Sequence, residues 1–386
     1  MSAEASTKKK LKALVIEDSE IDALLLIEQL KAGGYELETQ RVDSAEGLSA
    51  ALAGQSWDII FSDHNMPSFS STAALKMVRA RNPDVPFLIV SGTIGEEVAV
   101  AAMRAGAQDY LMKGNMARLV AAVERELQDA AERRARKEAE RTLLAQEEEF
   151  RLAREIQQHL FPAQAPVFEG YDLAGASFPA AATGGDYYDF ISTPSGDVLV
   201  VVGDVTGHGL GPALLMADVR AYLRALALAH HGVAEMLTNA RSLLLRDLGL
   251  DYFISLFFAR LEPATGMWSY INAGHPPGLV LPGDGGAPLE MFPTTPALGI
   301  DRDEEPLVPK QVQLKANDII LLVSDGIIEA WAPDGEEFGE ERMLAVVQRE
   351  RERPAAEIIQ ALMDAVRAHS GTNVLQDDMT AVVIKH

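Results

Sequence analysis

Acidic, hydroxyl and ammonium side chains end a series of short apolar runs in the first third of the chain. The first run ends at Glu17 and Asp18, the third at Asp63, the fourth at Ser91 and the fifth at Lys113. Because the carboxyl ends of parallel strands meet in one crevice, this order predicts a single acidic pocket. Three carboxylates that lie close together repel one another, so we expect a hard divalent cation, Mg²⁺, among their oxygens.

The expected pocket has the groups that transfer of a phosphoryl group to a side chain requires. Asp63 would be the nucleophile, and Mg²⁺ held by Asp18 and Asp63 would neutralise the incoming phosphoryl group. Lys113 and Ser91 would contact the phosphoryl oxygens. A single acid at the end of a strand is ordinarily a helix cap or a solvated side chain, so the prediction depends on the whole combination.

A second set of acidic residues lies in four short motifs of the second half of the chain. These residues are Asp186, Asp204 followed by Val205, Asp325, and the pair Asp377 and Asp378. Glycine beside an acid lets the backbone approach an ion closely, and carboxylates from separate strands form an oxygen-only site that suits Mg²⁺ or Mn²⁺ better than Zn²⁺. Two metal ions in such a site generate hydroxide near neutral pH and orient it for attack on a phosphate ester. The motifs therefore predict metal-assisted hydrolysis.

Composition restricts the chemistry and the partners. The 386-residue chain has 34 basic and 57 acidic residues and a formal charge of -23, which disfavours binding to nucleic-acid phosphates. There is no cysteine, which excludes thiolate catalysis, disulfides and thiolate zinc ligands and suits a reducing cytoplasm. We find no apolar stretch that is long enough for a signal peptide or a membrane span. We therefore expect a cytoplasmic protein that binds neither nucleic acid nor membrane.

Two different patterns of elements would position these two sets of residues. From Lys12 to Gly114, five apolar runs alternate with helical patterns, which predicts a doubly wound, flavodoxin-like parallel sheet. From Tyr171 onward, longer strands joined by hairpin-like turns are interrupted by two helical regions. This second pattern predicts a mixed sheet sandwich flanked by helices, in the order α-β-β-α.

The segment between Gly114 and Pro162 contains neither glycine nor proline, which predicts one long helix. Its apolar residues fall near heptad spacing at both ends but are sparse from Glu132 to Arg141. A solvated linker helix and a dimeric coiled coil with a weak centre both fit this pattern, and we expect the coiled coil. The predicted divisions are a disordered N-terminus at 1–10, the doubly wound domain at 11–125, the linker at 126–160 and the sandwich at 161–386.

The motifs of the first domain resemble the receiver domain of bacterial response regulators. They are Ile16-Glu17-Asp18, Asp58 to Asp63 followed by Met66-Pro67, Val90-Ser91-Gly92, and Gly106 to Lys113. The resemblance implies that a sensor histidine kinase phosphorylates Asp63 within an active site that also contains Glu17, Asp18, Ser91 and Lys113. It places Ser91 and Tyr110 at the positions that shift on activation. A receiver that binds partners without being phosphorylated is the alternative.

The four acidic motifs of the second half, together with the segment from Asn272 to Pro276, resemble the PPM family of metal-dependent serine/threonine phosphatases, in the bacterial branch typified by SpoIIE. The resemblance begins near Arg151. It implies that Asp204 bridges two Mg²⁺ or Mn²⁺ ions, that the Val205 carbonyl ligates one of them, and that Asp204 and Asp325 are catalytic. The remaining metal-shell residues would be Asp186, Asp325, Asp377 and, next to it, Asp378. Three further polar residues are interpreted as local hydrogen-bonding residues that hold loops: Asp189, His208 and His275.

The two resemblances together imply a response regulator with a phosphatase output. Phosphorylation of Asp63 would act through a homodimer formed by the linker helix and would reposition the segment from Gln157 to Pro162 against the metal site. The substrate would carry phosphoserine or phosphothreonine, and the resemblance points to an anti-sigma-factor antagonist of the STAS type. Two alternatives stay open: a catalytically weak adaptor that binds a sigma-factor regulator, and a constitutive phosphatase that uses the receiver only to dimerise.

Overall fold

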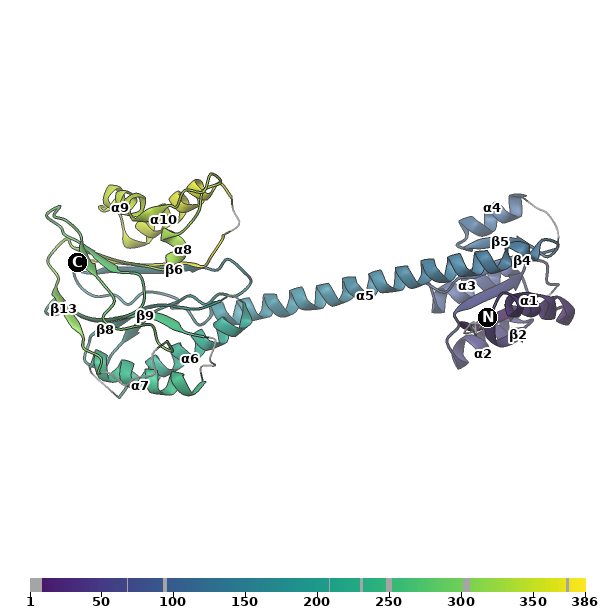
Figure 1. Ribbon diagram of the computed structural model, residues 1–386, viewed down its shortest axis with the longest axis horizontal. Coiled ribbons are helices and arrows are strands. Elements are labelled where there is room, and N and C mark those ends of the chain that lie inside the picture. Colours follow the sequence, from purple (N-terminus) through teal and green to yellow (C-terminus); the bar gives the residue numbers. More distant parts are fainter. Residues whose placement is uncertain are drawn as a thin grey trace, which may run out of the picture. The chain divides into compact units, whose positions relative to one another are not determined.

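The computed structural model describes residues 9–67, 69–92, 96–207, 209–229, 232–247, 252–300, 306–372 and 375–386. The chain divides into two compact units, residues 1–145 and 146–386 (Figure 1). Residues 1–8 of the segment predicted to be disordered lie outside the described residues. Lys9 and Lys10 already belong to the first strand.

The first unit contains a parallel sheet with the strand order β2-β1-β3-β4-β5. The strands are β1 (Lys9–Ile16), β2 (Tyr35–Val42), β3 (Ile59–Asp63), β4 (Phe87–Ser91) and β5 (Asp109–Met112). The helices are α1 (Glu20–Ala32), α2 (Ala45–Gly54), α3 (Ser71–Arg81) and α4 (Glu96–Arg104). The predicted doubly wound sheet is confirmed.

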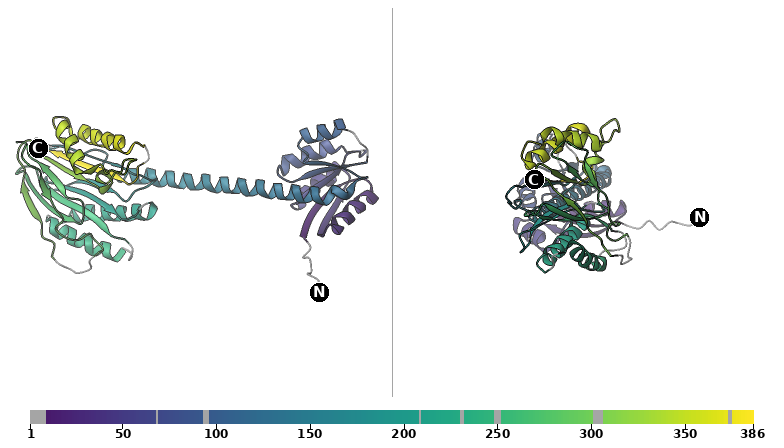
Figure 2. Two further views of the ribbon diagram at one scale, coloured as in Figure 1. Left: turned by 45° about the horizontal axis from the view of Figure 1, so that its top comes forward. Right: turned by 90° about the vertical axis from the view of Figure 1, so that its left-hand side faces the viewer.

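Helices cover both faces of this sheet, as Figure 2 shows. One core packs α2, α3 and α4 against the sheet, and the other packs α1 and the start of the long helix against it. Every residue of β3 and of β4 is therefore buried. A strand covered on both faces reads as a continuous apolar run, which is why the sequence shows these strands without alternation.

A single helix, α5 (Leu119–Gln158), follows the short turn η1 (Met116–Arg118) and confirms the predicted long helix. Leu119 and Val123, in its first turns, are fully buried in the core of the first unit. Further along, Leu143, Phe150 and Ile156 have 55%, 48% and 67% of their surface exposed. Exposed apolar residues of this kind support the coiled-coil dimer, which stays a prediction.

The second unit is a sandwich of two five-stranded sheets, with the strand orders β13-β10-β9-β8-β7 and β12-β11-β14-β15-β6. The named strands of both sheets pair antiparallel, so the predicted mixed sheet was wrong; hairpin-like connections favour antiparallel neighbours. The strands of the first sheet are β7 (Tyr187–Ser192), β8 (Val198–Val205), β9 (Ile254–Glu262), β10 (Met267–Ala273) and β13 (Lys310–Gln313). Those of the second are β6 (Asp172–Phe178), β11 (Gly278–Leu281), β12 (Leu289–Met291), β14 (Ile319–Val323) and β15 (Met379–Lys385).

Helices cover the outer face of each sheet, which confirms the predicted sandwich with helical outer layers (Figure 1). The pair α6 (Leu210–Leu226) and α7 (Val233–Asp247) packs on the first sheet, and the group α8 (Asp325–Ile328), α9 (Gly339–Glu350) and α10 (Ala355–Ser370) packs on the second. In β8, Leu199 and Val201 face the helices, whereas Val200 and Val202 face the other sheet. Successive strand residues point to opposite faces, so both faces of β8 are apolar.

None of the helices in the described part of the chain combines the length and the apolar composition that a membrane span requires.

Candidate functional sites

The first candidate site lies at the carboxyl ends of β1 and β3. Glu17, Asp18 and Asp63 each offer a carboxylate oxygen, and these atoms all lie within 4.8 Å of one another. Among the described residues, this is the one group of three or more acidic or histidine side chains with that property. Glu17 and Asp63 are buried and Asp18 is exposed, so the cluster opens to solvent on one side. Such an arrangement of oxygens fits a hard divalent cation.

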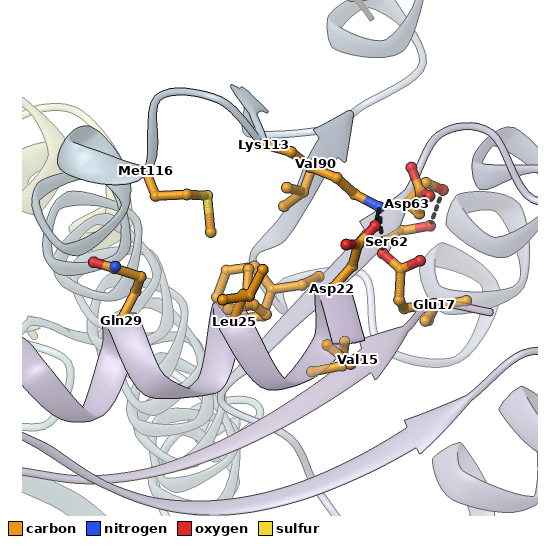
Figure 3. A pocket seen from close by; sticks show the side chains of 14 residues that line it. Val15, Glu17, Asp22, Leu25, Gln29, Ser62, Asp63, Val90, Lys113 and Met116 are labelled. Carbon is orange, nitrogen blue, oxygen red and sulfur yellow. Dashed lines mark hydrogen bonds and ion pairs between the residues drawn. The ribbon is translucent and has the colours of Figure 1, made fainter. Parts of the chain in front are cut away.

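An ammonium group already neutralises part of this cluster (Figure 3). The Lys113 Nζ lies 2.9 Å from Asp63 Oδ2, 2.8 Å from Glu17 Oε2 and 2.5 Å from Asp22 Oδ2. Partial burial lowers the pKa of Lys113, but its hydrogen bonds to the three acids outweigh burial and hold the pKa above its ordinary value. Burial raises the pKa of Glu17, and the hydrogen bonds from Lys113 and the Ser19 backbone N–H only partly offset that effect. Lys113 therefore stays charged.

Asp22 is a member of this network that the sequence analysis missed. It lies in the first turn of α1, where its backbone N–H donates to the Ser19 side chain that caps the helix. The Ser-x-x-Asp spacing that begins at Ser19 indicates a helix start and places Asp22 in the first turn of α1, but it does not indicate the contact with Lys113.

The other residues predicted for this site lie on the neighbouring strands. Ser91 is fully buried at the carboxyl end of β4, and Tyr110 is half-buried in β5. A cavity of about 210 Å³ extends from the acids between α1 and η1 and is lined by apolar side chains that include Leu25 and Met116 (Figure 3). The structure thus brings Glu17, Asp18, Asp63 and Lys113 together, with Ser91 at the end of the adjacent strand.

The second candidate site contains five acids that come from both sheets of the sandwich, although among these described residues no three bring carboxylate oxygens within 4.8 Å of one another, as the receiver acids do. Asp186 precedes β7, Asp204 lies in β8, Asp325 opens α8, and Asp377 and Asp378 precede β15. Asp186 has 2% of its surface exposed, and its Oδ2 atom has no hydrogen-bond partner. Within the described residues, no ion pair involves any of these five acids.

Burial and the charges of neighbouring carboxylates raise the pKa values of Asp186, Asp204, Asp325 and Asp378. Burial, followed by the charges of Asp325, Asp377 and Asp378, raises the pKa of Asp204 to about 7. Burial and then the charge of Asp204 hold the pKa of Asp186 well above its ordinary value. Like charges in a desolvated site favour protonation unless a cation neutralises them. An unpartnered buried oxygen and a set of oxygen donors with raised pKa values fit Mg²⁺ or Mn²⁺.

Two glycines provide the space that this arrangement needs. A Cβ atom on Gly185 would lie 2.4 Å from the Val205 carbonyl oxygen and 3.0 Å from Asp204 Oδ1. A Cβ atom on Gly184 would lie 2.1 Å from Asp378 Oδ2. A side chain at Gly185 would force the loop before Asp186 away from β8, and a side chain at Gly184 would displace the Asp378 carboxylate.

The adjacent acids Asp377 and Asp378 differ in their surroundings. Asp378 is buried, and its two carboxylate oxygens accept hydrogen bonds from the backbone N–H groups of Ala180 (2.7 Å) and Gly185 (2.8 Å). Asp377 is exposed, and its Oδ1 accepts a bond from the Asp378 N–H at 2.8 Å. The geometry favours Asp377 as the metal ligand and gives Asp378 the task of holding the loop, while a direct metal contact of Asp378 stays a prediction.

The residues expected to hold loops behave differently from the five acids. Asp189 is fully buried and forms two hydrogen bonds with the Arg224 guanidinium, at 2.6 and 2.7 Å. The His275 Nδ1 lies 2.9 Å from Ser255 Oγ, and burial lowers the pKa of His275 to about 3, so its ring is neutral. His208 lies outside the described residues.

The end of α5 contacts the loop that carries Asp186. The buried Gln157 side chain donates to the Gly184 carbonyl oxygen at 2.7 Å and accepts from the Gly184 N–H at 3.1 Å. Just beyond the helix, the Leu160 carbonyl accepts a bond of 2.6 Å from Arg220 of α6. Action of the segment from Gln157 to Pro162 at the metal site stays a prediction, and its contact with Gly184 could not be predicted from the sequence.

Comparisons with known proteins agree with this division of the chain. Residues 194–386 match the family described as Stage II sporulation protein E (SpoIIE), and residues 13–124 match the response regulator receiver domain. Protein IcfG of Synechocystis sp. is 23% identical over 398 residues, which cover 96% of this chain and 58% of IcfG. The chain thus spans little more than half the length of that relative.

Two further comparisons concern the second unit. Phosphoserine phosphatase RsbU of Bacillus subtilis is 25% identical over 244 residues, which cover 61% of this chain and 70% of RsbU. The solved SiaA-PP2C domain of Pseudomonas aeruginosa superposes with a TM-score of 0.55 at 19% identity and covers 64% of this chain and 98% of that domain. The sandwich therefore has the fold of that domain.

Proposed function

Since this chain belongs to the Stage II sporulation protein E family and carries a response regulator receiver domain at its N-terminal side, we propose that it is a metal-dependent phosphoprotein phosphatase controlled by phosphorylation of Asp63. The observation that carries the proposal is the second acidic site. Five acids converge there without a basic partner among the described residues, beside a backbone carbonyl that glycine leaves accessible. Bound cations would relieve the repulsion among these carboxylates. Divalent cations in such a site can also activate water for the hydrolysis of phosphate esters.

The residues of the second site divide the work of hydrolysis. Asp204 would hold two divalent cations with the Val205 carbonyl, and Asp186, Asp325 and Asp377 would complete their shells. The bound ions would supply a hydroxide nucleophile and would offset the charge that develops on the phosphate. Asp378 fixes the loop that carries Asp186 through its bonds to Ala180 and Gly185, so it positions a ligand. Burial of Asp186 and partial burial of Asp204 and Asp325 lower the local dielectric constant and strengthen the attraction of these three carboxylates for a cation.

The receiver residues would accept the phosphoryl group from a sensor histidine kinase. Asp63 would be the acceptor, with Mg²⁺ held by Asp18 and Asp63 beside Glu17. The Lys113 ammonium group lies 2.9 Å from the Asp63 carboxylate. After phosphorylation of Asp63, a small movement would let it contact a phosphoryl oxygen. Ser91, at the end of the next strand, would contact a second oxygen.

The helix α5 is the element that would transmit the change. Its first turns belong to the receiver core through Leu119 and Val123, and its last turn holds Gly184 through Gln157. Gly184 lies two residues before Asp186. A shift of α5 in a homodimer would therefore change the position of a metal ligand, and phosphorylation would select between two arrangements of the helix.

The substrate proposed here is a protein that carries phosphoserine or phosphothreonine. The name of the relative RsbU, a phosphoserine phosphatase, supports this class. The resemblance stated above points more narrowly to an anti-sigma-factor antagonist with a STAS domain. Retention of all five acids supports catalysis over the alternative of an inactive adaptor.

The proposal is tested by Mn²⁺-dependent hydrolysis of p-nitrophenyl phosphate and of a phosphoserine peptide, with and without the phosphoryl mimic beryllofluoride. We expect turnover in the wild type, none in Asp204→Asn, and no response to beryllofluoride in Asp63→Ala. Gln157→Ala should keep metal binding but lose most of the response, because Gly184 is released from α5. Absence of metal-dependent turnover in every state would refute the proposed activity. Turnover that ignores beryllofluoride in the wild type would refute the control by the receiver.

A further inference from the structure

A cavity of about 180 Å³ lies directly beside the second acidic site, bounded by α8, α10 and the loop before β15. Val366 and Met379 form part of an apolar floor, and Glu329, Trp331, Gln376 and Asp377 stand among the polar and aromatic groups that line it. Asp377 thus belongs both to the cavity and to the acidic site. An occupant of the cavity would therefore lie next to Asp377 and the acidic site.

The wall of this cavity is fixed in place by a side-chain amide. Gln376 Oε1 accepts from the Trp331 N–H at 3.1 Å, and Gln376 Nε2 donates to the Trp331 carbonyl at 3.4 Å. The Trp331 side chain is nevertheless 45% exposed, which is unusual for the largest apolar residue type in a folded domain. Glu329 and Asp377 are both exposed and both line the cavity, so two carboxylates face the same space. Among the described residues that line the cavity, none is basic.

These features suit one kind of occupant. The aliphatic part of a lysine or arginine side chain can lie on an apolar floor while its charged end stays near an acid and an aromatic face. Glu329 is outside the set of acids that would hold the cations, and its exposed carboxylate is free to face a basic side chain in the cavity. We infer that this cavity is a subsite for a basic side chain of the phosphoprotein substrate, close to its phosphorylated serine or threonine. The inference rests on the proposed phosphatase function and narrows its substrate class.

The test uses the full-length protein with Mn²⁺ and a series of phosphoserine peptides in which one lysine is moved stepwise along both sides of the phosphoserine. A matched series carries norleucine, which has the same aliphatic chain length but no charge. The variants are Glu329→Gln, Trp331→Ala, and the control Glu290→Gln on the exposed strand β12. Hydrolysis of p-nitrophenyl phosphate, which has no neighbouring side chain, reports the integrity of the metal site in each variant.

We expect the wild type to prefer lysine over norleucine at one position by about tenfold in kcat/KM, as a cation–π contact with an ionic partner provides. The preference should fall towards unity in Glu329→Gln and should decrease in Trp331→Ala, while Glu290→Gln keeps it. Turnover of p-nitrophenyl phosphate should change by no more than about twofold in all three variants.

Equal rates for the lysine and norleucine peptides at every position, with turnover of p-nitrophenyl phosphate intact, would overturn the inference and leave the proposed function standing. A lysine preference that survives both Glu329→Gln and Trp331→Ala would overturn the assignment to this cavity. Absence of turnover of every substrate by the wild type would overturn both the proposed function and this inference.

Discussion

The two acidic sites of this chain differ in whether a basic side chain reduces the repulsion between their carboxylates. In the receiver, three carboxylates share one ammonium group, because Lys113 contacts Glu17, Asp22 and Asp63 at 2.8, 2.5 and 2.9 Å. In the sandwich domain, five carboxylates converge, and no basic side chain contacts them among the described residues. There the pKa of Asp204 rises to about 7.

This difference indicates how each site is coupled to metal. A divalent cation entering the receiver has to compete with Lys113 for Glu17 and Asp63, so binding exchanges one cation for another. A cation entering the sandwich site meets no competitor except protons, so binding removes repulsion that the folded state otherwise carries. The receiver should therefore fold well without metal, whereas the sandwich domain should gain much of its stability from metal.

The largest expected effect is on the response of the two domains to Mn²⁺. At a thousandfold excess over the dissociation constant, the ion should stabilise the sandwich domain by about 4 kcal/mol. At the same concentration we expect the receiver to gain less, because Lys113 must first be displaced. Hydrogen exchange resolved by peptide, with Mn²⁺ or with chelator, measures both domains in one sample. An equal increase in hydrogen-exchange protection of the two domains on addition of Mn²⁺ would contradict the expected difference between them.

Removal of the Lys113 ammonium group should leave the receiver, like the sandwich domain, with acidic side chains that have no basic partner. Lys113→Met leaves Glu17 and Asp63 buried without a counter-charge and should lower the free energy of unfolding of the receiver by about 2 kcal/mol in chelator. Part of this loss should return on addition of Mg²⁺. Lys76→Met, at an exposed position of α3, is the matched control. A variant as stable as the control would show that Lys113 has no such role.

Removal of one carboxylate charge from the sandwich site should stabilise the metal-free protein. Asp204 is protonated more readily when folded than when unfolded, so its contribution to stability is present below about pH 4 and is lost as the pH rises through about 7. Asp204→Asn should flatten this dependence and raise the stability of the sandwich domain at pH 7 in chelator by about 1 to 2 kcal/mol. Urea unfolding across this pH range measures it, with Asp284→Asn in an exposed loop as the control. A loss of stability in the variant would contradict the assignment.

The smallest expected effect concerns Asp22, whose side chain is 36% exposed. Asp22→Asn should lower the stability of the receiver by about 0.5 kcal/mol, the usual size for a partly solvated ion pair. In the Lys113→Met background the same substitution should have almost no effect if Asp22 acts through Lys113. An unchanged effect in both backgrounds would mean that Asp22 contributes through the α1 helix cap alone.

Much of this arrangement could be predicted from the sequence because regular elements fix where side chains meet. Parallel strands share one carboxyl edge, so Glu17, Asp18 and Asp63 could be placed together from the order of apolar runs alone. The absence of glycine and proline between Gly114 and Pro162 was sufficient to predict α5. The continuous apolar run of β8 likewise indicates a strand that is buried on both faces.

The features that sequence reasoning missed depend on contacts between distant residues. Nothing around Gln157 indicates that its amide would bind Gly184, because that contact exists only when the loop before Asp186 is folded. Asp377 and Asp378 are neighbours that precede β15, so no regular periodicity indicates which of them is buried. Asp22 looks like an ordinary acid in the first turn of a helix until Lys113 is placed beside it.

The pairing of β6 with β15 has a consequence for how the chain is made. These strands are neighbours from the pair Phe178 and Met379 to the pair Asp172 and Lys385, although they lie at opposite ends of the sandwich sequence. During synthesis the receiver can therefore fold early, while β6 and β14 keep unpaired edges until β15 leaves the ribosome. Asp377, directly before β15, reaches its place only in that closing step. A nascent chain can thus contain a folded receiver domain before its sandwich domain is complete.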